Sequence, residues 1–183
     1  MRIIAGKYRG AKLNTLEGLT TRPTLDATKE AIFNSIGSFI PDFITLDLFG
    51  GSGALSLESL SRGAKKSIIN EINNDALKII ESNKNKLKIK NELIIEKMDY
   101  KACLKKYQNQ KFDIIFIDPP FRMKVIDEIN QFIIDNDMII DGGFIIAEYP
   151  KEDVVEKEYE GYNIKLCRVY SSSEILILEK EER

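Results

Sequence analysis

Short apolar blocks alternate along the chain with stretches in which apolar residues recur at helical spacing. Several blocks are rich in isoleucine and are typical of buried strands: Ile44–Phe49, Ser67–Asn70, Leu93–Ile95, Phe112–Ile117, Phe144–Ala147 and Ile175–Leu178. Helical spacing occurs in the stretches between them: Ala54–Arg62, Ala76–Leu87 and Val125–Ile133. Strands that alternate with helices over short links predict an α/β fold, in which helices cover both faces of a mostly parallel sheet.

The last two apolar runs depart from this alternation. Tyr162–Val169 and Glu174–Leu178 are separated only by Tyr170, Ser171, Ser172 and Ser173. This connection has no room for a helix, so we expect the last strand to run antiparallel to the others.

Two further elements are predicted before the sheet. Arg2–Ile4 and Ala11–Leu13 flank a glycine-containing turn, and this pattern predicts a small β-hairpin. Thr24 is a suitable N-cap for a helix from about Leu25 to Ser38.

The length of 183 residues fits one domain, with residues 1–20 as a hairpin extension and residues 21–183 as the domain itself. Apolar residues make up 43% and charged residues 31%, which is typical of a soluble globular protein. The chain contains no histidine, which excludes Ser-His-Asp and Cys-His triads and every His-ligated metal site. The two cysteines, Cys103 and Cys167, have no CxxC spacing, so we expect no metal and no disulfide framework. We expect a cytoplasmic protein without a membrane partner, because no apolar run has the length of a membrane span or resembles a secretory leader.

Charge is distributed unevenly along the chain, although the net charge is only −2. Residues 1–25 contain five basic residues and a single acid, Glu17, and the segment from Lys84 to Lys111 contains nine lysines and three acids. Acidic residues dominate from Asp141 onward. The net charge excludes a uniformly basic coat, whereas the distribution fits a local basic face for RNA. A solvated surface without a partner explains the lysines of residues 84–90 equally well.

A glycine-rich segment follows the first predicted strand and opens a helix. Its glycines, Gly50, Gly51 and Gly53, let a ligand approach the backbone and the helix N-terminus closely. Ser56 stands where a dinucleotide site would have its third glycine. Asp47, at the strand end, suits the ammonium group of S-adenosylmethionine better than a pyrophosphate. A glycine turn that binds nothing is the alternative.

Acidic residues follow the next two predicted strands. Glu71 can accept both ribose hydroxyls of a nucleoside, and Ile72 can pack on an adenine ring. Asp99 can accept a hydrogen bond from the adenine amine, although an N-capping role explains this residue equally well. Glu71 alone does not distinguish a dinucleotide from S-adenosylmethionine.

The fourth predicted strand ends in Asp118-Pro119-Pro120-Phe121. Two prolines remove two N–H donors, so the Asp118 carboxylate and the Pro119 carbonyl remain as acceptors at the strand end. Phe121 adds an aromatic face on which a planar base can stack. Two acceptors hold the hydrogens of an aromatic amine and return electron density to its nitrogen. This arrangement favours in-line attack on an adjacent sulfonium methyl group.

Together these motifs resemble a class I S-adenosylmethionine-dependent methyltransferase that acts on an amino group. Segments near the N-terminus narrow the resemblance to the RsmD family, which methylates N2 of a guanine in bacterial 16S ribosomal RNA. The similarity extends in order from Arg2 to about Arg122 and depends on several spaced segments: Arg2–Leu13, Thr21–Thr24, Lys29–Asn34, Gly53–Glu58 and Leu60–Gly63. Ala27 and Thr28 depart from the family, which often has basic residues there.

The resemblance implies a Rossmann-like, seven-stranded sheet and a role for each matched residue. Cofactor-binding roles fall on Asp47, Phe49, Gly50, Gly51, Gly53, Glu71, Ile72, Asp99, Arg22 and Thr24. An RNA phosphate is the alternative partner of Arg22. Asp118, Pro119 and Phe121 would hold the target guanine. RNA-binding roles fall on Lys7, Tyr8, Arg9, Lys12 and Arg122. The implied partner is 16S rRNA within the 30S subunit or an assembly intermediate, and we expect a monomer.

Other functions share some of these features. An N6-adenine DNA methyltransferase or a glutamine methyltransferase shares the cofactor site, but more often has Asn where Asp118 stands. A nucleotide-dependent oxidoreductase explains the glycine segment and Glu71, but not the Asp-Pro-Pro-Phe sequence. A non-enzymatic RNA-binding module explains the basic N-terminal segment, but has no use for acids at three successive strand ends.

Overall fold

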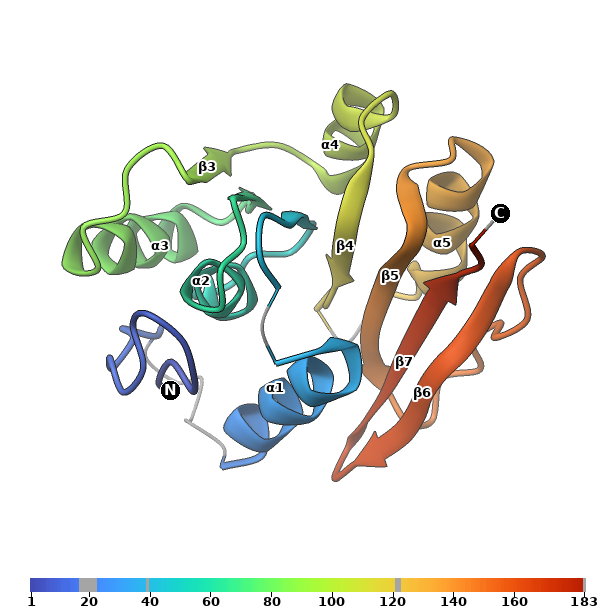
Figure 1. Cartoon of the computed structure of the whole chain (residues 1–183), viewed down its shortest axis with the longest axis horizontal. Coiled ribbons are helices and arrows are strands. Elements are labelled where there is room, and N and C mark those ends of the chain that lie inside the picture. Colours follow the sequence, from blue (N-terminus) through green and yellow to red (C-terminus); the bar gives the residue numbers. More distant parts are fainter. Residues whose placement is uncertain (17–22, 39, 121–122, 183) are drawn as a thin grey trace.

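The computed structural model describes residues 1–16, 23–38, 40–120 and 123–182, without the side chains of residues 23–25. A seven-stranded sheet in the order β3-β2-β1-β4-β5-β7-β6 forms the centre of the molecule (Figure 1). Its strands are β1 (Ile44–Asp47), β2 (Lys66–Asn70), β3 (Leu93–Glu96), β4 (Phe112–Ile117), β5 (Ile139–Pro150), β6 (Tyr162–Tyr170) and β7 (Ser173–Lys180). β1 to β5 are parallel, whereas β7 pairs antiparallel with both β5 and β6. The predicted α/β fold and the antiparallel last strand are confirmed.

Helices cover both faces of the sheet, as predicted. They are α1 (Pro23–Ile36), α2 (Ala54–Ser61), α3 (Asn74–Lys86), α4 (Tyr100–Tyr107) and α5 (Ile126–Asp135). α4 and α5 pack on one face, around buried residues such as Ile115 and Ile145. α1, α2 and α3 pack on the opposite face, around Phe116 and Ile146. Successive side chains of each strand therefore point alternately into two separate hydrophobic cores, one on each face of the sheet. Within the described ranges, no helix has the length and apolar character needed to cross a membrane.

The start of α1 differs from the prediction. The helix begins at Pro23, so Thr24 lies within its first turn and the predicted N-cap role is wrong. Proline is favoured at the first helical position, because its fixed φ suits a helix and its missing N–H is not needed there. The helix ends at Ile36, before Gly37, which has a φ of 108°.

The amino-terminal segment, residues 1–16, forms a tight turn with less strand structure than predicted. A single antiparallel bridge joins Arg2 to Lys12, and Ile3 N–H donates to Ala11 O at 3.0 Å. The turn lies beside α2 (Figure 1), and Gly6 packs against Ser61, the last residue of α2. A Cβ at Gly6 would lie 1.8 Å from the Ser61 carbonyl oxygen, so only glycine fits.

Hydrogen bonds to a buried carboxylate on α2 hold this segment in place. The Glu58 side chain is fully buried and accepts from the backbone N–H groups of Ile4 and Ala5 at 2.8 and 3.0 Å. It also pairs with Arg62 at 2.8 Å and with Lys29 at 3.2 Å. Burial lowers the pKa of Lys29, and the charge of Glu58 opposes that shift. The segment is therefore attached by a desolvated ion cluster rather than by a strand ladder.

We predict that Glu58→Gln destabilises the fold by roughly 3–5 kcal/mol, because it leaves two buried cations without their counter-charge. Urea unfolding measures this loss. Asp75→Asn is the matched control, since it removes the 2.8 Å contact to Lys78 at an exposed ion pair and leaves the unfolding midpoint nearly unchanged. Equal midpoints for Glu58→Gln and Asp75→Asn would contradict the structural role assigned to the cluster.

Candidate active site at the carboxyl edge of the sheet

The sheet topology brings the predicted acidic residues to one edge. Asp47 ends β1, and its register partners are Ile69 of β2 and Phe116 of β4. Glu71 and Asp118 therefore leave neighbouring parallel strands on either side of Asp47. The chain order reverses here, because β2 and β3 extend to one side of β1 and β4 lies on the other. Open α/β sheets bind ligands at this kind of position.

The glycine-rich loop after β1 is tightly packed against β2. Gly50 N–H donates to Asn70 O at 2.8 Å, and a Cβ at Gly50 would lie 2.5 Å from the Ile69 side chain. Gly53 has a φ of 82° and precedes α2 without a side-chain cap. Glycine is thus required by close approach at one position and by backbone conformation at the other.

Asp47 has an unusual environment for a carboxylate. It is 2% exposed, and its Oδ2 atom accepts a hydrogen bond from Ser56 Oγ at 3.1 Å. Oδ1 is buried and has no hydrogen-bond partner among the described residues. Burial raises the pKa of Asp47 to about 7, while hydrogen bonds from Ser56 and from the backbone N–H of Phe49 oppose this shift. A buried acceptor without a donor fits a cationic ligand group such as an ammonium.

Glu71 is connected to the glycine-rich loop. Its Oε2 atom accepts from Gly51 N–H and its Oε1 atom accepts from Asn73 N–H, each at 2.8 Å. Each carboxylate oxygen has two lone-pair sites, so hydroxyl donors can still be accommodated. The neighbouring Ile72 is 62% exposed, which is rare for a large apolar side chain. The two residues therefore combine polar acceptors with an apolar surface, as a nucleoside requires.

Asp99 and Phe49 lie on the α4 side of this edge. Asp99 is the N-cap of α4 and accepts from Lys101 N–H at 2.9 Å, so the structure shows the capping role. The half-buried Phe49 packs against Tyr100, with ring centroids 5.5 Å apart. Adenine recognition by Asp99 stays a prediction.

Asp118 follows β4 directly and is half-buried, and the next residue, Pro119, is buried. Burial raises the pKa of Asp118 well above its ordinary value, with smaller contributions from the charges of Glu148 and Asp47. Met123 N–H donates to Pro120 O at 2.8 Å. Four predicted site positions lie outside the part of the chain, or the side chains, that the structure describes: Arg22, Thr24, Phe121 and Arg122.

Two residues that contact or neighbour the site were missed in the sequence. Ser56 donates to Asp47 from α2, and Glu148 follows the apolar run Phe144–Ala147 as Asp118 follows Ile117. Glu148 had a signal, namely an acid directly after a buried apolar run, although in the structure it lies within β5. Ser56 had none, because a serine two residues into a helix is ordinary.

Two of the predicted RNA-contact residues, Lys7 and Tyr8, lie at the far end of α2 from the glycine-rich loop, whereas Met1 of the same segment accepts from Ser52 Oγ of that loop at 3.5 Å. Lys7 N–H donates to Ser61 O at 2.7 Å, and Tyr8 N–H donates to Ser61 Oγ at 2.9 Å. α2 is eight residues long, so the contacts of Lys7 and Tyr8 with Ser61 are about 12 Å from the glycine loop along the helix. Lys7, Arg9 and Lys12 are exposed.

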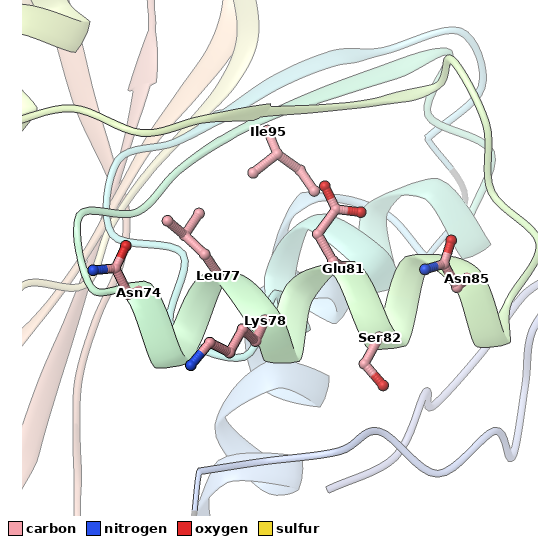
Figure 2. Close-up of a pocket in the computed structure, with 7 residues that line it drawn as sticks. All are labelled: Asn74, Leu77, Lys78, Glu81, Ser82, Asn85 and Ile95. Atoms are coloured by element: carbon pink, nitrogen blue, oxygen red, sulfur yellow. The ribbon is translucent and has the colours of Figure 1, made fainter.

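An open groove of about 920 Å³ runs along α3 and is closed on one side by Ile95 of β3 (Figure 2). The side chains of Leu77, Glu81 and Ile95 converge in it, while those of Lys78 and Ser82 point away from Ile95 (Figure 2). None of the predicted site residues lines this groove. We therefore assign the candidate active site to the carboxyl edge of the sheet and not to the groove.

The fold and the acids at its carboxyl edge define a Rossmann-like methyltransferase. A family model described as "Conserved hypothetical protein 95" matches residues 1–179, and the chain belongs to this family, the RsmD family. The "Ribosomal RNA small subunit methyltransferase D" of Haemophilus influenzae is 35% identical over 157 residues, covering 83% of this chain and 80% of that protein. The Bacillus subtilis protein YlbH is 32% identical, covering 93% of this chain and 98% of that protein. The solved structure of yhhF from Escherichia coli has a TM-score of 0.87 and 30% identity, covering 100% of this chain and 99% of that chain.

The raised pKa of Asp47 predicts a pH-dependent cost to stability. Between its ordinary value of 3.8 and about 7, the folded state holds a proton that the unfolded state has lost, so stability falls as pH rises. Asp47→Asn removes this linkage. We expect the stability of Asp47→Asn relative to the natural chain to be roughly 2–3 kcal/mol more favourable at pH 8 than at pH 5.

Urea unfolding at the two pH values measures this difference. Asp135→Asn, at the exposed end of α5, is the control and should show no such change. A gap between Asp47→Asn and the natural chain that is the same at pH 5 and pH 8 would show that Asp47 is ionised in the folded protein throughout.

Proposed function

We propose that this protein transfers a methyl group from S-adenosylmethionine to the exocyclic N2 amine of a guanine in 16S rRNA of the small ribosomal subunit. The observation that carries the proposal is the meeting of Asp47, Glu71 and Asp118 at neighbouring strand ends. Family membership supports the substrate class, because relatives include proteins named for methylation of small-subunit ribosomal RNA. The Asp-Pro-Pro-Phe sequence supports an amine as the acceptor.

The cofactor site fits S-adenosylmethionine in three respects. The buried Oδ1 atom of Asp47 would accept from the ammonium group, and the Glu71 carboxylate would accept from the ribose hydroxyls. The exposed Ile72 would cover one face of the adenine. Bound there, the cofactor would supply an electrophilic sulfonium methyl group.

The amine site is formed by acceptors alone. The Asp118 carboxylate and the Pro119 carbonyl would accept the two hydrogens of the guanine N2 amine, while Phe121 would stack on the base. These hydrogen bonds favour a tetrahedral nitrogen whose lone pair is available for attack. Catalysis then depends on position and electrostatics, which suits a chain without histidine.

We further propose that the amino-terminal turn and the end of α3 form one basic surface for the RNA backbone. Lys86 Nζ donates to Lys12 O at 2.7 Å, and Asn83 and Asn14 exchange hydrogen bonds at 2.7 and 3.0 Å. Lys7 and Lys90 both act on Glu92, whose pKa is lowered first by backbone hydrogen bonds and then by these charges. The lysines near 84–90 are thus adjacent to Lys7 and Lys12 in space.

The central experiment combines tritiated S-adenosylmethionine with 30S subunits that lack the modification. We expect label transfer by the natural chain, recovery of the label as N2-methylguanosine, and a loss of at least about 100-fold for Asp118→Ala. Calorimetry should show that Asp118→Ala still binds the cofactor within about threefold of the natural affinity, because Asp118 faces the amine.

Two outcomes would contradict the proposal at different levels. Transfer to DNA or to a protein acceptor but not to 30S subunits would overturn the substrate. Loss of cofactor binding in Asp118→Ala would show that Asp118 belongs to the cofactor site.

The basic surface predicts a change in salt dependence. Replacement of Lys7, Arg9 and Lys12 by glutamine should weaken 30S binding and reduce the slope of log affinity against log salt by about 2–3. Lys105, Lys151 and Arg168, which are exposed on other elements, provide a charge-matched triple glutamine control. A slope equal to that of the control variant would remove the amino-terminal turn from the RNA surface.

A further inference from the structure

A second carboxylate lies beside Asp118 on the neighbouring strand. β4 and β5 pair in parallel, with Ile117 opposite Ala147. The residue after each of these is an acid: Asp118, directly after the end of β4, and Glu148, within β5. Paired parallel strands lie about 4.8 Å apart, so these two side chains are immediate neighbours.

Both acids belong to the sheet face that α1 and α2 cover. Phe116 and Ile146, two residues earlier on each strand, are part of the core on that face. Strand alternation therefore directs Asp118 and Glu148 to the same side. Asp47 joins them there, because its carboxylate contacts Ser56 of α2.

Glu148 is held in position from the third strand of this group. Ser173 Oγ donates to Glu148 Oε1 at 2.7 Å, from the first residue of β7. Burial raises the pKa of Glu148, and the Ser173 hydrogen bond opposes that shift by stabilising the charged form. Among the described residues, the charged groups that act on Asp118 are Glu148 from β5 and Asp47 from β1.

An acidic cluster has other possible uses, and the surroundings discriminate between them. Within the described ranges, no group of three or more acidic or cysteine side chains is arranged to hold a metal ion. The fully buried, unpartnered Oδ1 atom of Asp47 beside the pair points instead to a cationic ligand. The reaction proposed above places a sulfonium and an amine that becomes positive at this edge.

We propose that Glu148 is a positioning residue that acts through Asp118: its negative charge strengthens Asp118 as an acceptor for the guanine amine and passes the released proton outward. This inference depends on the proposed methyl transfer. In the reaction, the bond between sulfur and the methyl carbon breaks and a bond between N2 and that carbon forms. One N2–H bond then breaks, its proton moves to Asp118, on to Glu148 and finally to water, and no electrons are gained or lost.

The arrangement has a consequence for pH dependence. Asp118 must be ionised to accept the amine, and the neighbouring charge of Glu148 raises the pKa of Asp118. Glu148→Gln removes that charge and therefore lowers the pKa of Asp118. In single-turnover methyl transfer to 30S subunits, we expect the acidic limb of the pH–rate profile to shift to lower pH by about one unit. We also expect the plateau rate to fall about tenfold or more, because Asp118 becomes a weaker acceptor and the proton route is interrupted.

Three variants make the test specific. Glu174→Gln is the matched control, because Glu174 is a half-buried acid on the adjacent strand β7 that pairs with Lys157 instead. Its acidic limb should coincide with that of the natural chain. Glu148→Asp should retain the limb and recover part of the plateau. Ser173→Ala should move the limb in the same direction as Glu148→Gln but less far, since it makes Glu148 harder to ionise.

A carbon-detected NMR titration of Asp118 provides a measurement that needs no substrate. The apparent pKa of Asp118 should fall in Glu148→Gln and stay constant in Glu174→Gln. Transfer by Glu148→Gln with an unmoved limb, or an unchanged Asp118 titration, would overturn the role of Glu148. If the natural chain labels no 30S subunit at any pH, the proposed function fails, while the titration still decides whether the two carboxyls are coupled.

Discussion

The pairing of β4 with β1 is the constraint on which the site depends. β4 returns to the side of β1 opposite β2, with Leu48 N–H donating to Phe116 O at 3.1 Å. Without this pairing, Asp118 would leave the sheet far from Asp47. The fold therefore assembles the chemistry through backbone hydrogen bonds between strands, and side-chain contacts refine positions that the topology already sets.

The site obtains its electrostatic character from desolvation. Asp47, Asp118 and Glu148 are acids whose pKa values are raised chiefly by burial. The folded protein bears this cost in the absence of a ligand, and a positively charged ligand or an amine that develops positive charge would reverse it. A chain without histidine thus obtains a group that titrates near neutrality, Asp47, from a carboxyl alone. The Ser56 and Ser173 hydroxyls limit the cost by stabilising the charged forms of Asp47 and Glu148.

The sequence was sufficient for the strands and for Asp47, Glu71 and Asp118 at their ends, because buried isoleucine-rich runs and a following carboxylate are local patterns. The order of the strands was predictable only through the resemblance, since pairing is a long-range property. Local signals also failed where tertiary contacts decide the structure. The amino-terminal turn has one bridge instead of two strands, because the backbone N–H groups of Ile4 and Ala5 donate to the Glu58 carboxylate and not to another strand. In the sequence, Glu58 was only the last residue of the matched segment Gly53–Glu58, and nothing local indicated its burial.

The attachment of the amino-terminal turn through Glu58 constrains how an RNA substrate can be bound. A flexible arm would let basic residues reach the active-site edge, whereas this turn is fixed in place. Lys7 and Tyr8 are bonded to Ser61 at the far end of α2, and Met1 accepts from Ser52 at the glycine loop. A basic contact at Lys7 would hold the RNA backbone beside α2 and α3, about one helix length from the glycine loop. A guanine that reaches Asp118 must then extend away from the RNA strand that is bound there. Enzymes that modify a base meet the same requirement by taking it out of its stack, which an unpaired or flipped nucleotide allows.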